Sequence, residues 1–371
     1  MLFFLYFIIT VLFIILITVS VNALFGPFLA KQHKLQSTPK VSLLIPARNE
    51  EKNIGTCLDH LLKQDYKNIE IIVLDDNSDD DTSAIVKNYS QYNGQITLIE
   101  GMELPDDWTG KNWACHQLGK KASGEIFIFT DADTQHGPHA VSNTAAWMQK
   151  LDLGMLSSFP QQITVTISEK LIVPVIDFFV YGLLMLWTTY FLKSPAFAAA
   201  NGQWIAFKKE AYQEIGGHES VKNEVVEDVE LNRRAKNLNM KTLTMAGTNA
   251  VYCRMYHSAH EVWHGFTKNF FGLTGHNIFI FLLIEFLLLS CCVLPYLIWM
   301  FSSTSFEIYL IILLNIAIRA VLAIRFKHPF LISILLHPVS ILYAAIIGFN
   351  SYYQFHWGHF QWKDRQIHFN E

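Results

Sequence analysis

Three acidic groups in the middle of the 371-residue chain have the side chains that metal and phosphate chemistry requires. They are Asp75-Asp76, Asp131-Ala132-Asp133 and Glu227-Asp228. The second group directly follows Ile126–Phe129, an apolar run that predicts a strand buried on both faces. Two carboxylates one residue apart at a strand end can approach one hard cation, and Mg²⁺ or Mn²⁺ accepts carboxylate and phosphate oxygens together. The spacing therefore predicts a divalent-metal site beside a phosphate-bearing ligand.

Other readings of these acids fit the sequence less well. Counted from Asp75, a calcium loop would need Gly at the sixth position and Glu at the twelfth, where the chain has Asp80 and Val86. Asp79–Asp81, just before Thr82, is typical of a helix cap. The chain has no GxGxxG after its first strand and no GxxxxGK[ST], which disfavours dinucleotide binding and a P-loop.

The acids lie in a segment that alternates between short strands and amphipathic helices. The predicted strands are Val41–Ile45, Ile69–Leu74, Ile96–Glu100 and Ile126–Thr130, and the predicted helices are Glu50–Lys63 and Thr82–Tyr89. This alternation predicts an α/β fold, with a mostly parallel central sheet and helices on both faces. Ligands of such sheets bind at the carboxyl ends of the strands, which is where Arg48-Asn49-Glu50 and the acidic groups occur.

Composition divides the chain into two kinds of material. It is 51% hydrophobic but only 16% charged, whereas about 25% is typical of soluble domains. Residues 1–30 have no charged side chain, and residues 270–356 have five. This excludes a simple cytosolic globule, a disordered chain and a small disulfide-stapled domain. The net charge of −4 and the lack of a long basic run argue against nucleic-acid binding, and five cysteines without a CxxC pair indicate reduced thiols.

The apolar ends predict membrane segments. Residues 2–29 are long enough for an anchor helix and lack the positive n-region of a signal peptide. Lys31, Lys34 and Lys40 follow at once, which places the middle of the chain in the cytoplasm and the N-terminus outside. Further apolar stretches are 278–301, 307–324 and 330–350. Pro338 interrupts the last stretch, so two interpretations of it stay open, a spanning segment and a re-entrant one. The side of the membrane on which the tail lies depends on which of them holds.

Two charged residues, Glu285 and Arg319, fall inside these stretches, where an unpaired charge is costly. In an antiparallel helix pair they would be offset by four residues, about 6 Å. An ion pair between them is one expectation. The other is that Arg319 reaches the cytoplasmic interface while Glu285 is protonated or faces protein.

The order of motifs resembles the membrane-anchored glycosyltransferases of family 2, which have the nucleotide-sugar-binding GT-A fold. The resemblance covers most of residues 40–270 and includes Ile45–Glu51, Val73–Ser78, Trp108–Ala114, Thr130–Asp133, Gly216–His218 and Glu227-Asp228. Arg254–Tyr256 and Glu261–Asn269 are similar to the branch that contains diaponeurosporenoate glycosyltransferases of the staphyloxanthin pathway and hopanoid-associated glycosyltransferases.

The resemblance implies roles for individual residues. The nucleotide-sugar pocket would comprise Pro46, Arg48, Glu50, Asp75, Asp76, Lys111 and Asp131. Asp133, with Asp131, would hold the Mn²⁺ or Mg²⁺ that bridges the donor diphosphate. Asp228, supported by Glu227, would be the general base for an inverting transfer. Arg254 is a further candidate for the diphosphate, and Trp263 for an acceptor or sugar face. Trp263 equally fits a buried or membrane-interface aromatic residue.

One departure from the family pattern concerns the product. Polysaccharide synthases and ceramide glucosyltransferases carry a Q/RxxRW motif after the base, and this chain has no such string. Its absence favours a single sugar transfer, with UDP-glucose as the expected donor. The acceptor expected at the cytoplasmic membrane face is a lipid such as a carotenoid acid or a triterpenoid. A polyprenyl-phosphate or polysaccharide-type transferase and an inactive membrane scaffold stay open as alternatives.

These expectations divide the chain into four parts. They are an anchor at 1–30, a cytoplasmic GT-A domain at 31–275, transmembrane or re-entrant helices at 276–352 and a polar tail at 353–371. Within the second part, residues 171–192 are apolar but contain Pro174 and Asp177. If this segment crossed the membrane, Asp131 and Asp228 would lie on opposite sides of it. We therefore expect an interfacial segment.

Overall fold

The structure is a computed structural model that describes residues 2–301, 305–357, 360–362 and 365–367. It separates into two units, each of which combines distant parts of the chain. The sheet unit comprises Gly26–Gln161 and Leu186–Cys253. The helical unit comprises Met1–Phe25, Gln162–Met185 and Arg254–Glu371.

A seven-stranded sheet with the order β3-β2-β1-β4-β8-β6-β9 forms the centre of the sheet unit. Its strands are β1 (Val41–Ala47), β2 (Ile69–Asp75), β3 (Ile96–Glu100), β4 (Ile126–Phe129), β6 (Met155–Phe159), β8 (Ile205–Lys208) and β9 (Thr242–Ala246). Strands β1 to β4 are parallel to one another, whereas β8 runs antiparallel to β4 and β6. The predicted α/β fold with a mostly parallel sheet is thus confirmed.

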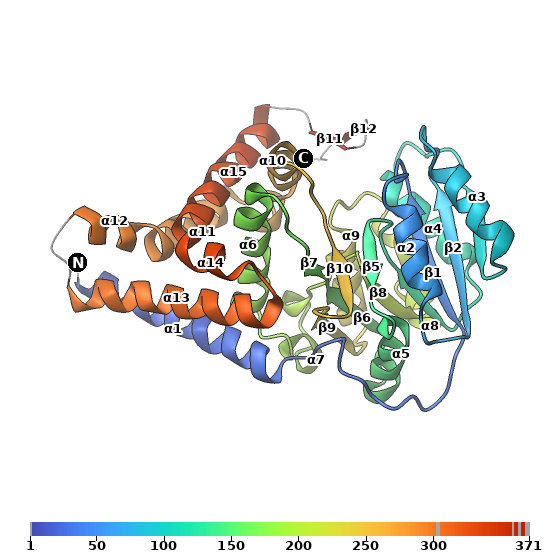
Figure 1. The fold of residues 1–371 in the computed structure, drawn as a ribbon, viewed down its shortest axis with the longest axis horizontal. Helices are drawn as coiled ribbons and strands as arrows, with labels where there is room; N and C mark the ends of the chain where they lie inside the picture. Colours follow the sequence, from blue (N-terminus) through green and yellow to red (C-terminus); the bar gives the residue numbers. More distant parts are fainter. Residues whose placement is uncertain (1, 302–304, 358–359, 363–364, 368–371) are drawn as a thin grey trace. The chain divides into compact units, whose positions relative to one another are not determined.

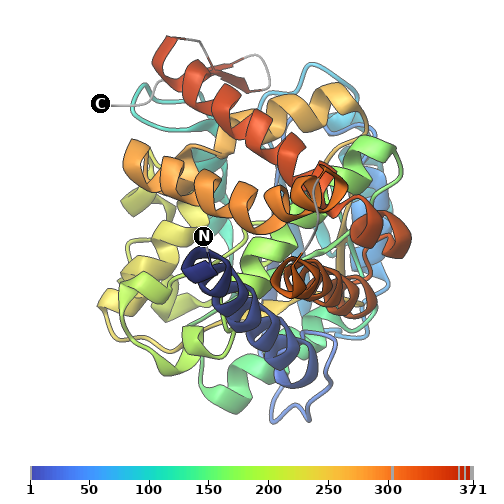
Figure 2. The same ribbon diagram turned by 90° about the vertical axis from the view of Figure 1, so that its left-hand side faces the viewer.

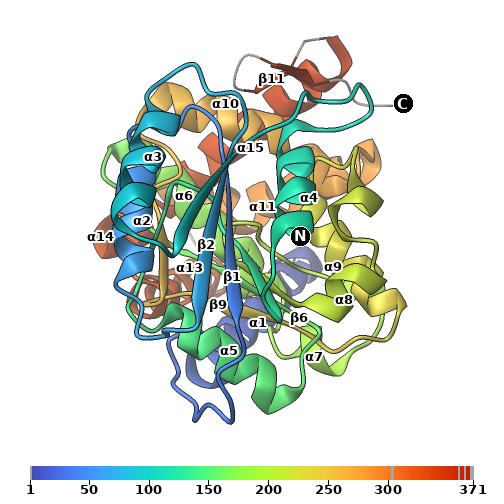
Figure 3. The same ribbon diagram turned by 90° about the vertical axis from the view of Figure 1, so that its right-hand side faces the viewer.

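Helices cover both faces of this sheet. They are α2 (Ile54–Leu62), α3 (Thr82–Tyr92), α4 (Gly110–Lys121), α5 (Ala140–Leu151), α7 (Thr188–Phe191), α8 (Lys209–Glu214) and α9 (Glu227–Asn237). Figure 3 shows α2 and α3 on one side of β1 and β2, and α4 on the other. Short strands β5 (Thr134–His136) and β10 (Val251–Cys253) pair antiparallel, and β7 is Gln161–Gln162.

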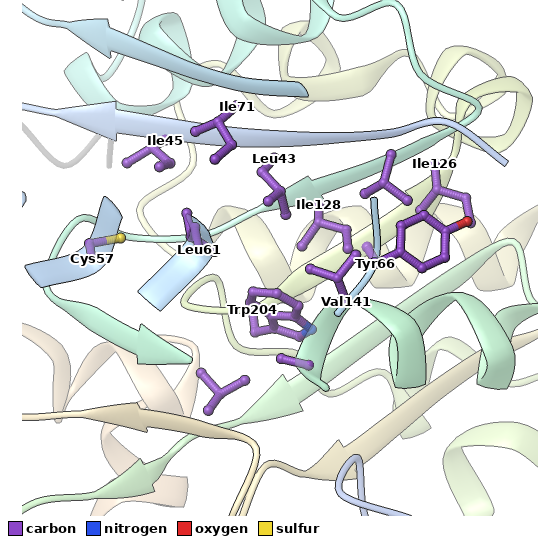
Figure 4. Close-up of a cluster of buried hydrophobic side chains, with 14 of the residues drawn as sticks. Leu43, Ile45, Cys57, Leu61, Tyr66, Ile71, Ile126, Ile128, Val141 and Trp204 are labelled. Atoms are coloured by element: carbon purple, nitrogen blue, oxygen red, sulfur yellow. The ribbon is translucent and has the colours of Figure 1, made fainter. Parts of the chain in front are cut away.

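The alternation of side chains along β1 explains how this arrangement is stabilised. Leu43 and Ile45 point to the cluster that contains Leu61 of α2 and Val141 of α5, which Figure 4 shows in close-up. Leu44, between them, belongs to the cluster on the opposite face, with α4 and α9. Successive strand residues face opposite sides of a sheet, so a strand apolar at every position needs a layer of helices on each face.

The helical unit contains the apolar ends of the chain. Its helices are α1 (Leu2–Phe25), α6 (Ile167–Leu183), α10 (Ala259–Asn269), α11 (Ile278–Cys292), α12 (Leu294–Phe301), α13 (Phe306–Phe326), α14 (Phe330–Leu335) and α15 (His337–Trp357). Within the described residues, three segments are long and apolar enough to cross a membrane, namely Leu2–Phe25, Ile278–Phe301 and Phe306–Phe326. Figures 1 and 2 show α1 alongside α13, where Arg325 Nε donates to the carbonyl of Ala23 over 2.8 Å.

Two predicted apolar segments are each divided into two helices. The stretch 330–350 forms α14 and α15, which are separated at Leu336, and Pro338 lies in the first turn of α15. A proline is tolerated there because an amide N–H at that position has no partner within the helix. The segment 171–192 contains most of α6 and the short α7. The interfacial location of this segment stays a prediction.

The expected ion pair between Glu285 and Arg319 is not formed, although both residues are described and both are buried. Arg319 instead donates from Nε to the carbonyl of Ser333 over 3.1 Å and from Nη1 to that of Pro174 over 3.2 Å. Glu285 lies against Gly348 of α15, where a side chain would collide with its carboxyl group. The prediction assumed a regular hairpin of two helices, whereas packing on α6 and α15 supplies each residue with different surroundings.

The end of the chain is described only in part. Residues 358–359, 363–364 and 368–371 of the predicted tail at 353–371 lie outside the described residues, as do 302–304 of the link before α13. The described segments Phe360–Trp362 (β11) and Arg365–Ile367 (β12) pair antiparallel.

Candidate active site

The carboxyl ends of β1, β2 and β4 bring the predicted site residues to one edge of the sheet. Ala47 of β1 is in register with Asp75 of β2, and the amide of Asp76 donates to the carbonyl of Ala47 over 2.8 Å. Arg48 Nη1 donates to the carbonyls of Asp76 (2.7 Å) and Asn77 (3.0 Å). The guanidinium group therefore holds the loop that carries the two acids.

The residues flanking this loop are tied to it in the same way. Asp75 and Asp76 are both buried, and Asp75 Oδ1 accepts from the amide of Ser78 over 3.4 Å. The amide of Glu50 donates to the Thr82 hydroxyl over 2.8 Å. The Arg48–Glu50 turn and the loop after β2 thus form one connected rim.

Lys111 connects two of the acidic groups. Its Nζ lies 3.0 Å from Asp131 Oδ1, at the end of β4, and 3.2 Å from Glu227 Oε1, at the start of α9. Burial disfavours the charged ammonium, but the two carboxylates outweigh this effect and raise the pKa of Lys111 well above its usual value. Lys111 is therefore a permanent cation that links acids almost 100 residues apart in sequence.

Asp228, the predicted base, is held by backbone amides. Its Oδ2 accepts from the amide of Gly202 and its Oδ1 from that of Val229, each over 2.7 Å. Burial and the neighbouring Glu227 carboxylate raise the pKa of Asp228 to about 7, against the opposing effects of Lys111 and the two amides. A carboxylate with a raised pKa is a stronger base, and one that titrates near neutrality suits general base catalysis.

Gly202 is a site residue that the sequence reasoning missed. A Cβ atom there would lie 3.1 Å from Lys111 Nζ, 3.4 Å from Glu227 Oε1 and 3.8 Å from Asp228 Oδ2. Only glycine therefore brings its amide to Asp228 without crowding the charged groups. The sole signal in the sequence was a glycine just before the strand that became β8.

These groups line one pocket of the sheet unit. Its lining includes Pro46, Lys111, Asp131, Gly202, Glu227 and Asp228, together with the apolar side chains of Phe129 and Leu231. His218 also borders it, with Nδ1 2.7 Å from the Tyr212 hydroxyl. Burial lowers the pKa of His218 to about 3, so its imidazole is neutral. The pocket offers acids, one ammonium group and apolar surface.

The carboxylates at the end of β4 suit a hard divalent cation by their chemistry. Among the described residues, no three His, Cys, Asp or Glu side chains are arranged to hold a metal ion. Asp131 and Asp133 could thus supply only part of a coordination shell, with the other ligands coming from donor oxygens and water, as is usual for Mg²⁺ at phosphates. The residue types fit such a shared site.

A buried polar network lies beneath Asp131. The Thr130 hydroxyl donates to the carbonyl of Gln203 over 2.8 Å, and the Thr134 hydroxyl to that of Asp131 over 2.7 Å. His136 Nε2 lies 3.0 Å from both threonine oxygens, which are 2.8 Å apart. None of these three side chains was expected in the site.

Arg254 and Trp263 belong to the helical unit. Arg254 donates from Nε and Nη2 to the two carboxylate oxygens of Glu169, over 3.2 and 3.1 Å. The ring of Trp263 stacks on that of Tyr343 with 6.3 Å between centroids. Their assignments to the diphosphate and to an acceptor stay predictions, as do the roles of the residues in the pocket.

Part of the segment that forms the sheet and the pocket matches a known protein family. Residues 42–172 match the family model described as glycosyl transferase family 2, so the chain carries a glycosyltransferase family 2 domain. The fold is similar to that of the mannosyltransferase PcManGT from Pyrobaculum calidifontis, solved in complex with GDP-Man and Mn²⁺. The TM-score is 0.52 at 18% identity, over 90% of this chain and 98% of that one. The likeness supports the GT-A fold.

Two named proteins are similar to this chain in sequence. The chain is 27% identical over 244 residues to 4,4'-diaponeurosporenoate glycosyltransferase of Staphylococcus haemolyticus. The matched residues are 64% of this chain and 63% of that protein. It is also 27% identical over 238 residues to the protein of that name from Staphylococcus aureus (strain USA300), which is 62% of this chain and 60% of the relative. The chain thus matches somewhat less than two thirds of the length of these relatives.

Proposed function

We propose that this chain is an inverting, metal-dependent glycosyltransferase. It moves one sugar from a nucleotide-sugar, UDP-glucose, to a membrane lipid such as a carotenoid acid or a triterpenoid. The observation that supports this most is the convergence of Asp131, Lys111, Glu227 and Asp228 on one pocket at the carboxyl edge of the sheet. The lipid acceptor is supported by the apolar helices and by the relatives named for a carotenoid acid.

The reaction needs a proton acceptor and charge stabilisation. Asp228 takes the proton of the acceptor hydroxyl while the acceptor oxygen bonds to the anomeric carbon. The bond from that carbon to the diphosphate oxygen breaks on the opposite face, so the diphosphate leaves with the electron pair and the configuration inverts. Gly202 and Val229 orient the carboxylate through their amides.

The nucleotide-sugar donor is held by the rim, formed by the Arg48–Glu50 turn and the loop after β2, and by the acids that follow β4. Pro46, Arg48, Glu50, Asp75 and Asp76 surround the nucleotide, and Lys111 and Asp131 face its sugar and diphosphate. Asp133, with Asp131, would hold Mn²⁺ or Mg²⁺. When bound, that cation supplies positive charge to the departing diphosphate.

The membrane arrangement belongs to the same proposal. Residues 1–30 anchor the chain, 31–275 face the cytoplasm with 171–192 at the interface, 276–352 contribute further membrane helices and 353–371 form a tail. The positive residues after the anchor support this orientation. A lipid dissolved in the membrane would then meet a soluble donor at the cytoplasmic surface.

Release of UDP tests the proposal. Membranes that contain the protein are incubated with UDP-glucose, Mn²⁺ and extracted lipids, and UDP is measured. Asp228→Asn should lower UDP release about 10²–10⁴-fold when the acceptor is a hydroxyl. An acceptor carboxylate is already ionised and needs no base, so for a carotenoid acid the loss should be far smaller.

The control and the contrary outcomes are defined by the same assay. Asp106→Asn changes an exposed acid of the sheet unit and should leave UDP release unchanged. Transfer only to polyprenyl phosphate, or formation of a polymer, would replace the proposed acceptor class. If no nucleotide-sugar were to raise the melting temperature and no UDP formed, the chain would be an inactive scaffold.

A further inference from the structure

The network beneath Asp131 determines which imidazole nitrogen of His136 carries the proton. The carbonyls of Gln203 and Asp131 can only accept, so the hydroxyl protons of Thr130 and Thr134 are both committed to them. The two threonine oxygens and His136 Nε2 form a triangle of close contacts. Hydrogen bonding within this triangle requires one further proton. His136 must supply it, as the neutral tautomer with hydrogen on Nε2.

The other ring nitrogen and the burial of the ring determine its total number of protons. His136 is buried, and its Nδ1 has no hydrogen-bond partner among the described residues. Nδ1 is thus unpartnered in either neutral tautomer, as a buried donor or as a buried acceptor, and the assignment rests on the triangle at Nε2. Burial also lowers the pKa of His136 to about 3, so the ring does not carry a second proton at neutral pH.

The network joins the two sides of the pocket. On one side, Thr134 holds the main chain of Asp131, and on the other, Thr130 holds the carbonyl of Gln203. The residue before Gln203 is Gly202, whose amide binds Asp228. The Nε2–H of His136 lies at the junction and bonds to both threonines.

The loop that carries Gly202 has further fixed points. The amide of Asn201 donates to the Ser157 hydroxyl over 2.7 Å, and Gln203 Nε2 donates to the Cys253 sulfur over 2.9 Å. These contacts hold the loop to β6 and β10, and the Thr130 contact joins it to the turn that carries Asp131. Loss of the junction would thus change the spacing of Asp131 and Asp228 without unfolding the loop.

We propose that His136 is a positioning residue, which acts through its Nε2–H to fix the spacing between the donor-side acid Asp131 and the base Asp228. The effect on catalysis rests on the function proposed above. The tautomer and the effect on the Gly202 amide depend on the structure alone.

Two substitutions distinguish the effect of the His136 N–H donor from the effect of the volume of its ring. His136→Gln keeps an N–H donor at a similar distance from the main chain, whereas His136→Leu fills the site without a donor. We expect His136→Leu to lower kcat at saturating donor by at least about tenfold, which corresponds to about 1.4 kcal/mol. His136→Gln should recover most of this loss. His139→Leu is the matched control, because His139 lies in the same segment and is exposed, and its side chain bonds Asp65, outside the network.

Two measurements need no substrate. Long-range ¹H–¹⁵N spectra of ¹⁵N-histidine-labelled protein in detergent should identify a neutral His136 with hydrogen on Nε2. Hydrogen exchange of the peptide that contains Gly202 should become faster in His136→Leu, but not in His136→Gln or His139→Leu. A hydrogen on Nδ1, or equal exchange in all variants, would overturn the proposal.

The assays also separate the two proposals. If the tautomer and exchange results hold but no variant transfers sugar, the proposed function fails while the positioning geometry stands. If both His136 variants lose kcat equally, in step with their melting temperatures, His136 is only a core residue and the positioning proposal is wrong.

Discussion

At the scale of single residues, the site depends on how closely its charges can approach one another. Lys111 lies between Asp131 and Glu227. Gly202, which has no side chain, fits closely against Lys111, Glu227 and Asp228. Two carboxylates in a partly buried pocket repel each other unless a cation lies between them. The local spacing of Lys111, Glu227 and Asp228 is therefore part of the chemistry.

Gly202→Ala tests this spacing. The added methyl group would lie 3.1 Å from Lys111 Nζ and 3.4 Å from Glu227 Oε1, so the charged side chains would have to move. Overpacking of this kind costs about 1–3 kcal/mol, and we expect kcat to fall about tenfold or more. Gly94→Ala is the control, because no atom lies within 4 Å of a Cβ there. Equal kcat values for the two variants would contradict the importance of Gly202.

The pH dependence of the free enzyme follows from Asp228. Burial and Glu227 raise its pKa to about 7, and only the ionised carboxylate accepts a proton. For a hydroxyl acceptor, kcat/KM should therefore be constant well above that pH and fall as the pH decreases through it. The check is a pH profile of kcat/KM in membranes. A profile that is flat from about pH 5.5 to 8.5 would show that Asp228 is not the base.

At the scale of elements, the site is held by side chains that tie α4 to the segment before α9. Asn112 is fully buried in α4, and its Nδ2 donates to the carbonyls of Val221 (2.7 Å), Lys222 (3.3 Å) and Glu224 (2.9 Å). The next residues along the chain lead directly to Glu227. The Asn112 amide group, together with the Thr109 amide that donates to the Lys222 carbonyl over 2.9 Å, thus fixes the approach of α9 to Lys111.

Asn112→Ala should loosen this connection. The substitution removes the Nδ2 hydrogen bonds to the carbonyls of Val221, Lys222 and Glu224, and this loss costs about 1–3 kcal/mol of unfolding free energy. We expect a lower melting temperature in detergent and a further loss of kcat, because Glu227 is no longer held against Lys111. Asn88→Ala, at an exposed position of α3, is the control. A normal melting temperature for Asn112→Ala would contradict this role.

At the scale of the whole molecule, the chain combines a charged sheet unit with a helical unit. In the described part of that helical unit, three segments are long and apolar enough to cross a membrane. All five cysteines are free and buried. A single exposed cysteine is therefore a clean reporter of which side of the membrane the sheet unit faces.

Asp106→Cys provides that reporter, because Asp106 is an exposed residue of the sheet unit. If 31–275 face the cytoplasm, a membrane-impermeant maleimide should label the variant in inverted vesicles but not in intact cells. The unsubstituted protein should stay unlabelled in both. Labelling in intact cells would reverse the proposed orientation.

Much of the fold could be predicted because its signals are local. Apolar runs such as Val41–Ile45 and Ile126–Thr130 indicate buried strands, and alternation with helices indicates a parallel sheet. The uncharged run at 2–29 indicates a possible membrane helix by its length and composition. The same reasoning brought Asp75, Asp131 and Arg48 to one edge, since carboxyl ends of parallel strands lie together.

The contacts that define the site depend on residues far apart in the chain, and only the tertiary structure decided them. Lys111 of α4 meets Glu227 of α9, and the Gly202 amide meets Asp228. Thr130 meets Gln203 because β8 returns antiparallel beside β4. Arg319 shows the same limit, since carbonyls of α6 and α14 replaced the partner expected from sequence spacing. Periodicity specifies which face of an element is buried, but the partner of a polar group depends on where distant elements bring their donors and acceptors.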